Sequence, residues 1–480
     1  MLKKIVNKWH RIPLAAKVSA SYAICSILQK SLSFITMPLF TRILTKEQYG
    51  EYTIYSSWSG IFSILLTLNL AYGSFSTAMV KFEDKRDEYI ASIQGICISL
   101  ASFFILIYLP FRSDWNRLLE MPTYMVFLLI FEVLSTTGFA LWSGRKRFEF
   151  KYKSVIAVTL LTSFASPVLA YIFVISSEKK GYARIFGYAL TAIVIYSFIF
   201  IKNMVKGKKI FHIGYWKYAL GFNIPLLAYY ISQVIFNQSD RIMISHICGK
   251  DKAAMYGVAY NLAMILTFVL NAINNTYIPW VYGKIKSMKT SDNKIVANGI
   301  SILMATLLLG VIWFAPEIIA IMAGNEYAEA KWVVAPVAMS LLLLYYSQLF
   351  INVEFYYEEK RSLVIASLGS LFVNVILNWL LIPRYGFVIA GYTTWISYII
   401  FAYANYIAMK KIFKKKNIDD DLYDYKTLVL IMILFTVLSF LGVVLYAYIL
   451  ARILVVAVVL IVLLFNIKKV IAIYNKWRER

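Results

Sequence analysis

Residues 428–446, LVLIMILFTVLSFLGVVLY, decide the fold class, because these 19 residues carry no charge and are apolar nearly all round the helix that they would form. A helix needs about 20 mostly apolar residues to cross the hydrocarbon core of a bilayer. A strand of a membrane barrel would instead alternate apolar and polar residues over about 10 positions. The segment therefore predicts an all-α membrane protein.

Comparable apolar stretches follow one another along the whole chain of 480 residues, of which 60% are hydrophobic and only 15% charged. This composition excludes a soluble multidomain protein. Dividing the apolar stretches at their charged breaks predicts a polytopic protein of about fourteen transmembrane helices. The predicted spans lie near residues 17–40, 54–78, 90–110, 122–143, 154–176, 184–202, 218–245, 254–278, 296–316, 333–353, 362–382, 387–408, 427–448 and 452–468.

The basic residues of the loops indicate which side of the membrane each loop faces. Of the 49 lysines and arginines, 35 fall on the side of the N-terminus, 13 on the opposite side, and Lys30 lies within the membrane. Cytoplasmic loops carry the excess of basic residues, so both termini are expected in the cytoplasm. The net charge of +24 thus reflects orientation and contact with anionic membrane lipids, and we expect no nucleic acid partner.

The cysteines and the N-terminal segment add two expectations. Cys25, Cys97 and Cys248 are scattered without pair spacing, so we expect no disulfide, no metal and no cofactor. The apolar run after the basic residues 1–17 contains Lys30 and is too long for a signal peptide. We expect it to be retained as the first span.

The chain is predicted to have three parts. The charged break at residues 410–426 separates twelve spans from a final pair that is almost free of polar residues. Tyr49-Gly50, after the first span, is echoed by Tyr256-Gly257, after the seventh, which divides the twelve into two sixes. Parallel repeats of this kind form transporters with the pathway between the halves. We expect two six-helix lobes around a central cavity, at residues 1–209 and 210–413, and a cytoplasmic linker with two accessory spans at residues 414–480.

Polar residues recur at spacings of three and four on spans 1, 7, 8 and 11, which places them on one face of each helix. The stripes on spans 7, 8 and 11 include Gln233, Asn237, Asn271, Asn275, Asn374 and Asn378. Together they predict an internal polar path that binds substrate. The alternative is that each side chain only hydrogen-bonds a neighbouring helix, which contributes about 1 kcal/mol.

Ionisable residues within spans are candidates for function, because a charge at the bilayer centre costs at least about 2.5 kcal/mol. Lys30 in span 1 would either pair with Glu132 in span 4 or bind a phosphate. Asp240 and Arg241, toward the outer end of span 7, would pair with each other, flank the path or reach the interface. Glu132 and Asp240 are also candidates for ion coupling. Arg42, at the outer end of span 1, is either a ligand or an interfacial anchor.

Three stretches carry a family resemblance. MPLFTRIL at residues 37–44, followed by Tyr49-Gly50, resembles the polysaccharide-biosynthesis branch of the multidrug, oligosaccharidyl-lipid and polysaccharide exporter superfamily. NIPL at residues 223–226, leading to Ser239-Asp240-Arg241, looks like the start of that family's second lobe. Residues 374–394 are similar to its hairpin of spans 11 and 12. The resemblance covers essentially the whole chain.

The resemblance implies a flippase that moves undecaprenyl-diphosphate-linked oligosaccharide repeat units from the inner to the outer leaflet of the bacterial cytoplasmic membrane, for O-antigen, capsule or similar polymers. It implies Lys30, Arg42 and Arg241 as diphosphate ligands, with a polysaccharide polymerase and a chain-length regulator as partners. The sequence contains no Gly-Lys loop for ATP hydrolysis, so we expect coupling to the membrane potential, H⁺ or Na⁺.

Two alternatives remain open. One is a cation-coupled multidrug antiporter on the same fold, which would use buried carboxylates. The other is a membrane-embedded polysaccharide polymerase or ligase, which would need acid-base groups on a sizeable outer loop. The predicted outer loops are short, and this favours a transporter over an enzyme.

Overall fold

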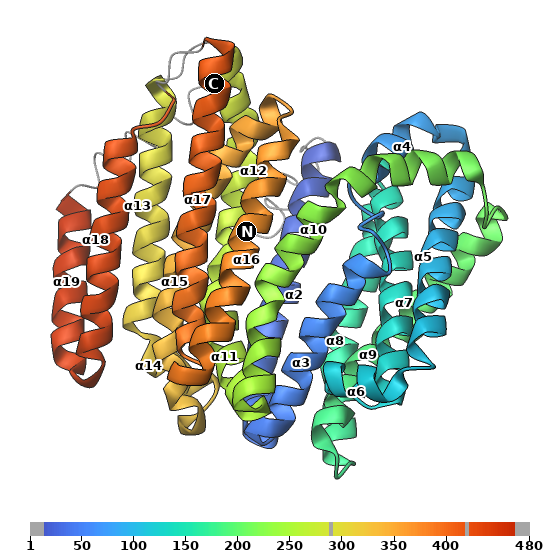
Figure 1. Ribbon diagram of the computed structural model, residues 1–480, viewed down its shortest axis with the longest axis horizontal. Coiled ribbons are helices and arrows are strands. Elements are labelled where there is room, and N and C mark those ends of the chain that lie inside the picture. Colours follow the sequence, from blue (N-terminus) through green and yellow to red (C-terminus); the bar gives the residue numbers. More distant parts are fainter. Residues whose placement is uncertain (1–13, 288–290, 418–421, 466–480) are drawn as a thin grey trace, which may run out of the picture. The chain divides into compact units, whose positions relative to one another are not determined.

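The computed structural model describes residues 14–287, 291–417 and 422–465, which form helices joined by short connections (Figure 1). No strand occurs within these ranges, and the predicted all-α fold is confirmed. The chain divides into two compact units, Met1–Ser245 (unit 1) and His246–Arg480 (unit 2). The predicted lobe boundaries at residues 209 and 413 stay predictions.

Unit 1 consists of long helices with two short ones, α4 and α6, at its opposite ends (Figure 1). Its helices are α2 (Leu14–Ile43), α3 (Lys46–Leu65), α4 (Phe75–Lys81), α5 (Arg86–Tyr108), α6 (Arg112–Leu119), α7 (Thr123–Phe148), α8 (Tyr152–Ile175), α9 (Lys180–Gly207) and most of α10 (Ile213–Cys248). A 3-10 turn, Glu83–Lys85, precedes α5.

Unit 2 also consists mainly of long helices, with one short helix of eight residues. Its helices are α11 (Lys250–Ala263), α12 (Thr267–Lys286), α13 (Ser291–Trp313), α14 (Ala315–Met322), α15 (Lys331–Tyr356), α16 (Lys360–Tyr385), α17 (Ile389–Lys416), α18 (Tyr425–Val444) and α19 (Ile449–Phe465). The 3-10 turns Met264–Leu266, Asn325–Ala330 and Leu445–Ala447 connect some of them.

Apolar side chains on the outside of the helices show that the protein spans a membrane more than once. On α9, Val194, Phe198, Ile201 and Val205 are each at least 60% exposed and share one face. In water such a stripe would favour aggregation, whereas in lipid it is solvated. Within the described residues, eleven helical segments are long and apolar enough to cross a membrane.

Eleven of the fourteen predicted spans correspond to these helical segments. The three predicted spans outside the eleven correspond to α3, α17 and α19. Tyrosine, serine, threonine and asparagine make α3 and α17 more polar than the other long helices, and α19 has only 17 described residues. The count of fourteen, and with it the sidedness, stays a prediction.

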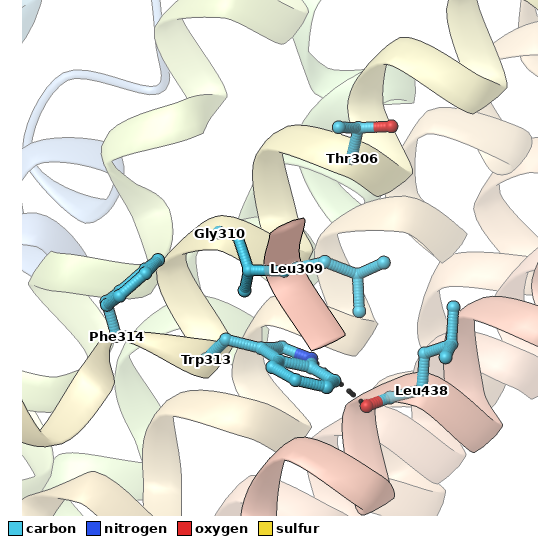
Figure 2. A pocket seen from close by; sticks show the side chains of 7 residues that line it. Thr306, Leu309, Gly310, Trp313, Phe314 and Leu438 are labelled. Carbon is cyan, nitrogen blue, oxygen red and sulfur yellow. Dashed lines mark hydrogen bonds between the residues drawn. The ribbon is translucent and has the colours of Figure 1, made fainter. Parts of the chain in front are cut away.

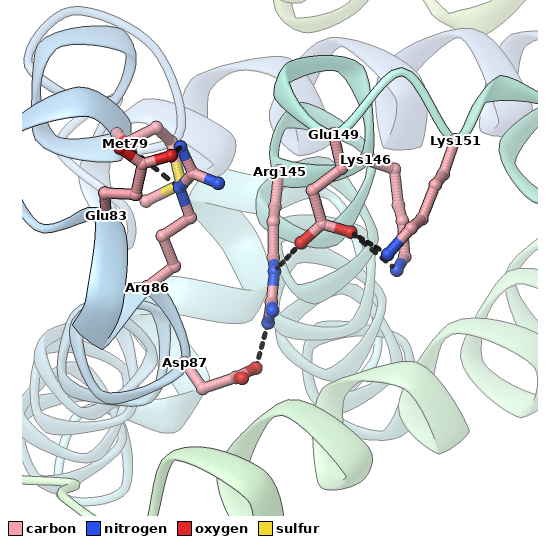
Figure 3. A network of polar contacts seen from close by, with 8 residues as sticks. All are labelled: Met79, Glu83, Arg86, Asp87, Arg145, Lys146, Glu149 and Lys151. Atoms are coloured by element: carbon pink, nitrogen blue, oxygen red, sulfur yellow. Dashed lines mark hydrogen bonds and ion pairs between the residues drawn. The ribbon is translucent and has the colours of Figure 1, made fainter.

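A charged network ties the start of α5 to the end of α7 (Figure 3). Glu149, directly after α7, accepts a hydrogen bond from Arg145 Nε at 2.5 Å and from Lys146 Nζ at 3.2 Å. Lys151 Nζ lies 3.1 Å from the same carboxylate. Arg145 also pairs with Asp87 in the first turn of α5. These contacts hold the turn between α7 and α8 in place.

The network predicts an acid-dependent stability. Burial raises the pKa of Glu149, but hydrogen bonds from Arg145, Lys151 and Lys146 outweigh burial and lower the pKa from 4.5 to about 2. This carboxylate therefore stabilises the fold at neutral pH and loses its effect as the pH falls through 4.5 toward 2. We expect Glu149→Gln to lower the midpoint of thermal unfolding by a few degrees at about pH 7, and the difference from wild type to narrow toward about pH 3.

The matched control is Glu83→Gln, because the carboxylate of Glu83 is 71% exposed in its ion pair. A surface pair contributes little, so this variant should melt with wild type at both pH values. An equal deficit of Glu149→Gln at neutral and acidic pH would contradict the prediction.

Candidate functional site

The three predicted phosphate ligands have different surroundings. Lys30 lies on α2, but its side chain falls outside the described residues. Arg42 is exposed in the last turn of the same helix. Arg241 is buried in α10 and donates from Nη1 to Oε1 of Gln238 at 2.9 Å. Their joint role as diphosphate ligands stays a prediction.

The polar stripe of α10 makes contacts inside unit 1. Asn237 Nδ2 donates to the backbone oxygen of Gln233, one turn earlier, at 2.7 Å. Gln238 packs against Gly60 of α3, where an added Cβ would lie 3.2 Å from the side-chain nitrogen. Asp240, on the same part of the helix, is 2% exposed. The bond of Asn237 within its own helix fits the structural alternative for that residue.

Glu132 is held by a tyrosine of a neighbouring helix. Tyr55 of α3 donates its hydroxyl hydrogen to Oε2 of Glu132, on α7, at 2.7 Å. The predicted ion pair with Lys30 is not tested, since the side chain of Lys30 lies outside the described residues. A carboxylate with a hydrogen-bond donor inside a bundle of apolar helices is typical of functional intramembrane residues.

Two of the predicted asparagines join α16 to α17. Asn374 and Asn378 have no exposed surface. Asn374 Nδ2 donates to Oγ1 of Thr394 at 3.3 Å, and Asn378 Nδ2 donates to Oδ1 of Asn374 at 3.3 Å. The hydroxyl of Thr393 donates to Oδ1 of Asn378. This arrangement matches the alternative in which stripe residues bond neighbouring helices.

The asparagines of α12 are arranged differently. Asn271 and Asn275 are exposed on unit 2 taken by itself. Between them, Asn274 accepts a hydrogen bond at 3.0 Å from Asn352 of α15. Since polar side chains in spans rarely face lipid, the exposed amides on α12 are compatible with the predicted polar path, which stays a prediction. These two residues are better candidates for cargo contact than Asn374 and Asn378.

A capping box determines how α3 begins. Gln48 N donates to Oγ1 of Thr45 at 3.2 Å, and Thr45 N donates to Oε1 of Gln48 at 3.1 Å. The two bonds satisfy backbone donors that the first turn of a helix leaves open. They fix the connection between α2 and α3. Tyr49 and Tyr52, which lie about one helical turn apart, then contact α9.

The residue that these tyrosines contact is Arg184 of α9, which is only 4% exposed. Its guanidinium carbon lies 3.7 Å from the ring centre of Tyr52, 4.4 Å from that of Phe40, 4.5 Å from that of Tyr49 and 6.0 Å from that of Tyr188. A desolvated cation-π contact contributes about 2 kcal/mol. We call these five residues the Arg184 cage.

The cage places aromatic rings against the guanidinium but leaves two of its nitrogen atoms without a hydrogen-bond partner in the described residues. Nε and Nη1 of Arg184 are buried and have no hydrogen-bond partner in the described part of the chain. Two nearby carboxylates have other partners, because Tyr55 bonds Glu132 and Tyr182 bonds Glu51. An unpaired buried donor costs about 1 to 3 kcal/mol, and more on a charged group. The cage is therefore not an ordinary structural ion pair.

The sequence analysis missed the cage, because Arg184 enters it only as the first residue of the predicted span 184–202. Two aromatic spacings could have drawn attention to it, namely Tyr49 with Tyr52 and Arg184 with Tyr188, each within one helical turn. Neither spacing shows that α2, α3 and α9 pack against each other, because that contact depends on the tertiary fold.

Unit 2 contains an apolar pocket of about 250 Å³ (Figure 2). Its lining residues are Thr306, Leu309, Gly310, Trp313, Phe314, Leu438 and Val456. Beside it, Trp313 Nε1 donates to the backbone oxygen of Leu438 at 3.1 Å. Arg452 of α19 binds the two carboxylate oxygens of Glu317 at 2.6 and 2.8 Å. These contacts hold α18 and α19 to α13 and α14.

The sequence was compared with known families and proteins. Residues 15–282 match the family described as polysaccharide biosynthesis protein. The chain belongs to this family. Lsg locus protein 1 of Haemophilus influenzae is 22% identical over 368 residues, which cover 75% of this chain and 89% of the relative. Capsular polysaccharide biosynthesis protein CapF of Staphylococcus aureus is 21% identical over 406 residues, which cover 81% and 98%.

Solved structures share the fold of this polysaccharide biosynthesis protein. The lipid II flippase MurJ, in an inward closed conformation, superposes with a TM-score of 0.68 at 14% identity and covers 93% of this chain and 99% of its own. An inward-facing multidrug resistance MATE family transporter of the MOP superfamily superposes with a TM-score of 0.63 at 13% identity, covering 80% and 95%. The predicted superfamily is confirmed.

The network of α16 and α17 predicts a structural role for Asn378 in this polysaccharide biosynthesis protein. Asn378→Ala removes the bond to Asn374 and leaves the Thr393 hydroxyl without its acceptor, so we expect a loss of about 1 kcal/mol in stability. The midpoint of thermal unfolding in detergent, followed by circular dichroism, should fall by a few degrees. Asn271→Ala is the control and should melt with wild type. Unchanged melting of Asn378→Ala together with lost polysaccharide export would favour a cargo ligand instead.

Proposed function

We propose that this protein is a flippase that moves undecaprenyl-diphosphate-linked oligosaccharide repeat units from the inner to the outer leaflet of the bacterial cytoplasmic membrane. Its products would serve O-antigen, capsule or similar polymers. The observation that carries the proposal is a polysaccharide biosynthesis family on the fold of a lipid II flippase. Family membership supports the pathway, and the fold supports transport of a lipid-linked sugar.

Solvation explains why such a cargo needs this kind of protein. Each hydroxyl that enters hydrocarbon without a partner costs several kcal/mol, so a sugar head group needs a hydrogen-bonding passage while its tail stays in lipid. Unit 1 buries Asp240 and Arg184 and partly buries Glu132 among helices whose outer faces are apolar. In unit 2, Asn271 and Asn275 offer amides at the surface. The apolar pocket bounded by α13, α18 and α19 has the chemistry for a segment of a hydrocarbon tail.

The membrane potential is the simplest driving force for export. Moving a negative charge out of an inside-negative cell is favoured by about 2.3 kcal/mol per charge per 100 mV. Proton or sodium coupling through Glu132 or Asp240 is the alternative. In proteoliposomes with valinomycin, we expect flipping to be slower with equal potassium on both sides than with a potassium gradient that sets up a favourable diffusion potential. Flipping that is unaffected by the potential but changes with a proton or sodium gradient would favour ion coupling.

A multidrug antiporter is the second candidate, because a MATE transporter shares the fold and two carboxylates lie inside unit 1. A polymerase or ligase has less support, since the long helices of the described chain are joined by short connections. We propose that the protein is not an enzyme and supplies a polysaccharide polymerase and a chain-length regulator with their substrate.

Depletion of the protein in its host tests the function directly. We expect completed lipid-linked repeat units to accumulate on the cytoplasmic leaflet, as measured by mass spectrometry after leaflet-selective enzymatic digestion. Units that reach the outer leaflet but stay unpolymerised would indicate an enzyme. Unchanged lipid-linked sugars would favour the antiporter.

Lys30→Ala tests the predicted phosphate ligand in the same assay. A cation that holds the diphosphate contributes roughly 1.5 to 3 kcal/mol, so its removal should slow flipping at least about tenfold. Lys286→Ala, which removes an exposed lysine at the end of α12, should retain wild-type flipping. Equal activity of both variants would remove Lys30 from the proposed site.

A further inference from the structure

Part of the buried guanidinium of Arg184 has no hydrogen-bond partner in the described residues. Aromatic rings attract a cation over their faces, and the guanidinium carbon lies within 4.5 Å of the ring centres of Phe40, Tyr49 and Tyr52. A ring face offers no lone-pair acceptor to the guanidinium N–H groups. Nε and Nη1 are both buried and without a partner in the residues that the structure describes.

Charge and geometry decide which group would complete the site. A guanidinium stays protonated and presents only donors, so cations and metal ions are excluded as ligands. Its N–H groups make their strongest hydrogen bonds to carboxylate and phosphate oxygens. The carboxylates of Glu51 and Glu132 bond Tyr182 and Tyr55 instead. The acceptor that fits best is thus an oxyanion from outside the chain.

We propose that the Arg184 cage is an oxyanion-binding site, formed where the end of α2, the start of α3 and the start of α9 meet. It takes a phosphate or carboxylate group. This inference rests on the proposed function, in which the cargo has two sources of such a group, the diphosphate linkage and an acidic sugar. Because Arg184 is only 4% exposed, we expect the site to bind the charged group itself and not the body of a sugar.

The position of the cage gives the site a role distinct from that of Lys30. Arg184 lies in the second turn of α9, on the predicted outer side, whereas Lys30 is predicted near the middle of span 1. A second anion site displaced toward the outer side would bind the cargo after it has left the first. We expect the Arg184 cage to act on this outward part of the path.

Anion binding to the purified protein in detergent tests the proposal without any flipping. The probes are sodium pyrophosphate and sodium glucuronate, with sodium chloride at matched ionic strength as the reference. We expect one of the two probes to raise the midpoint of thermal unfolding of wild type and of Lys30→Ala. In the Lys30→Ala background, Arg184→Gln should weaken binding of that probe at least about tenfold, since a charge-assisted hydrogen bond is lost.

The variants separate anion binding from a purely structural role. Arg184→Lys keeps the positive charge but loses the planar set of donors, so we expect it to bind the probe more weakly than wild type. Arg112→Gln removes an exposed arginine at the start of α6 and should bind as wild type does. If Arg184→Gln does not fold, the comparison of Arg184→Lys with wild type carries the test.

The response to the two probes either supports the anion site and identifies its ligand or overturns the proposal. A response to pyrophosphate alone assigns the site to the diphosphate, and a response to glucuronate alone assigns it to an acidic sugar. No response of wild type to either probe, or unchanged probe binding when Arg184→Gln is added to the Lys30→Ala background, overturns the proposal. Because no transport is measured, anion binding in the cage would stand even if flipping assays refuted the proposed function.

Discussion

Inside hydrocarbon a backbone N–H or C=O group has no water to bond, so each one must be satisfied within the protein. Helices meet this requirement segment by segment, and the described chain is built from them. Hydroxyl groups on the spans follow the same constraint, because Thr41, Thr53 and Ser57 each donate to the carbonyl one turn earlier. The other polar side chains are concentrated where helices pack against each other, so the candidate functional residues lie there.

Two buried arginines, Arg452 and Arg184, satisfy their hydrogen-bond donors to different extents. In unit 2, both Nη atoms of Arg452 bond Glu317, and Nη1 also bonds the backbone oxygen of Trp313. That pairing fastens one element to another, although Nε of Arg452 is also buried without a partner in the described residues. In unit 1, Arg184 lies among aromatic rings, and both Nε and Nη1 have no hydrogen-bond partner in the described residues. Such an arrangement is costly for stability, and the proposed anion would satisfy these donors.

The short helices of the two units have different roles. Unit 1 contains α6 and unit 2 contains α14, each of eight residues. The helix α6 is bound locally, because Asn116 accepts from Tyr108 and donates to Thr123. In contrast, α14 supplies the Glu317 that holds α19. In unit 2, the short helix thus attaches α19 beside the apolar pocket.

The sequence by itself determined the all-α class, the membrane setting and the superfamily, because the length of an apolar run and a local motif do not depend on distant residues. It did not decide the partners of the polar residues. Asn378 was predicted either to line a polar path or to bond a neighbouring helix, and it bonds Asn374 and Thr393. Arg184 was predicted only as the first residue of the span 184–202. A side chain on one span finds its partner on helices that are distant in the sequence. Only the packing of the helices establishes those contacts, so only the tertiary structure shows the partners of Asn378 and the aromatic rings around Arg184.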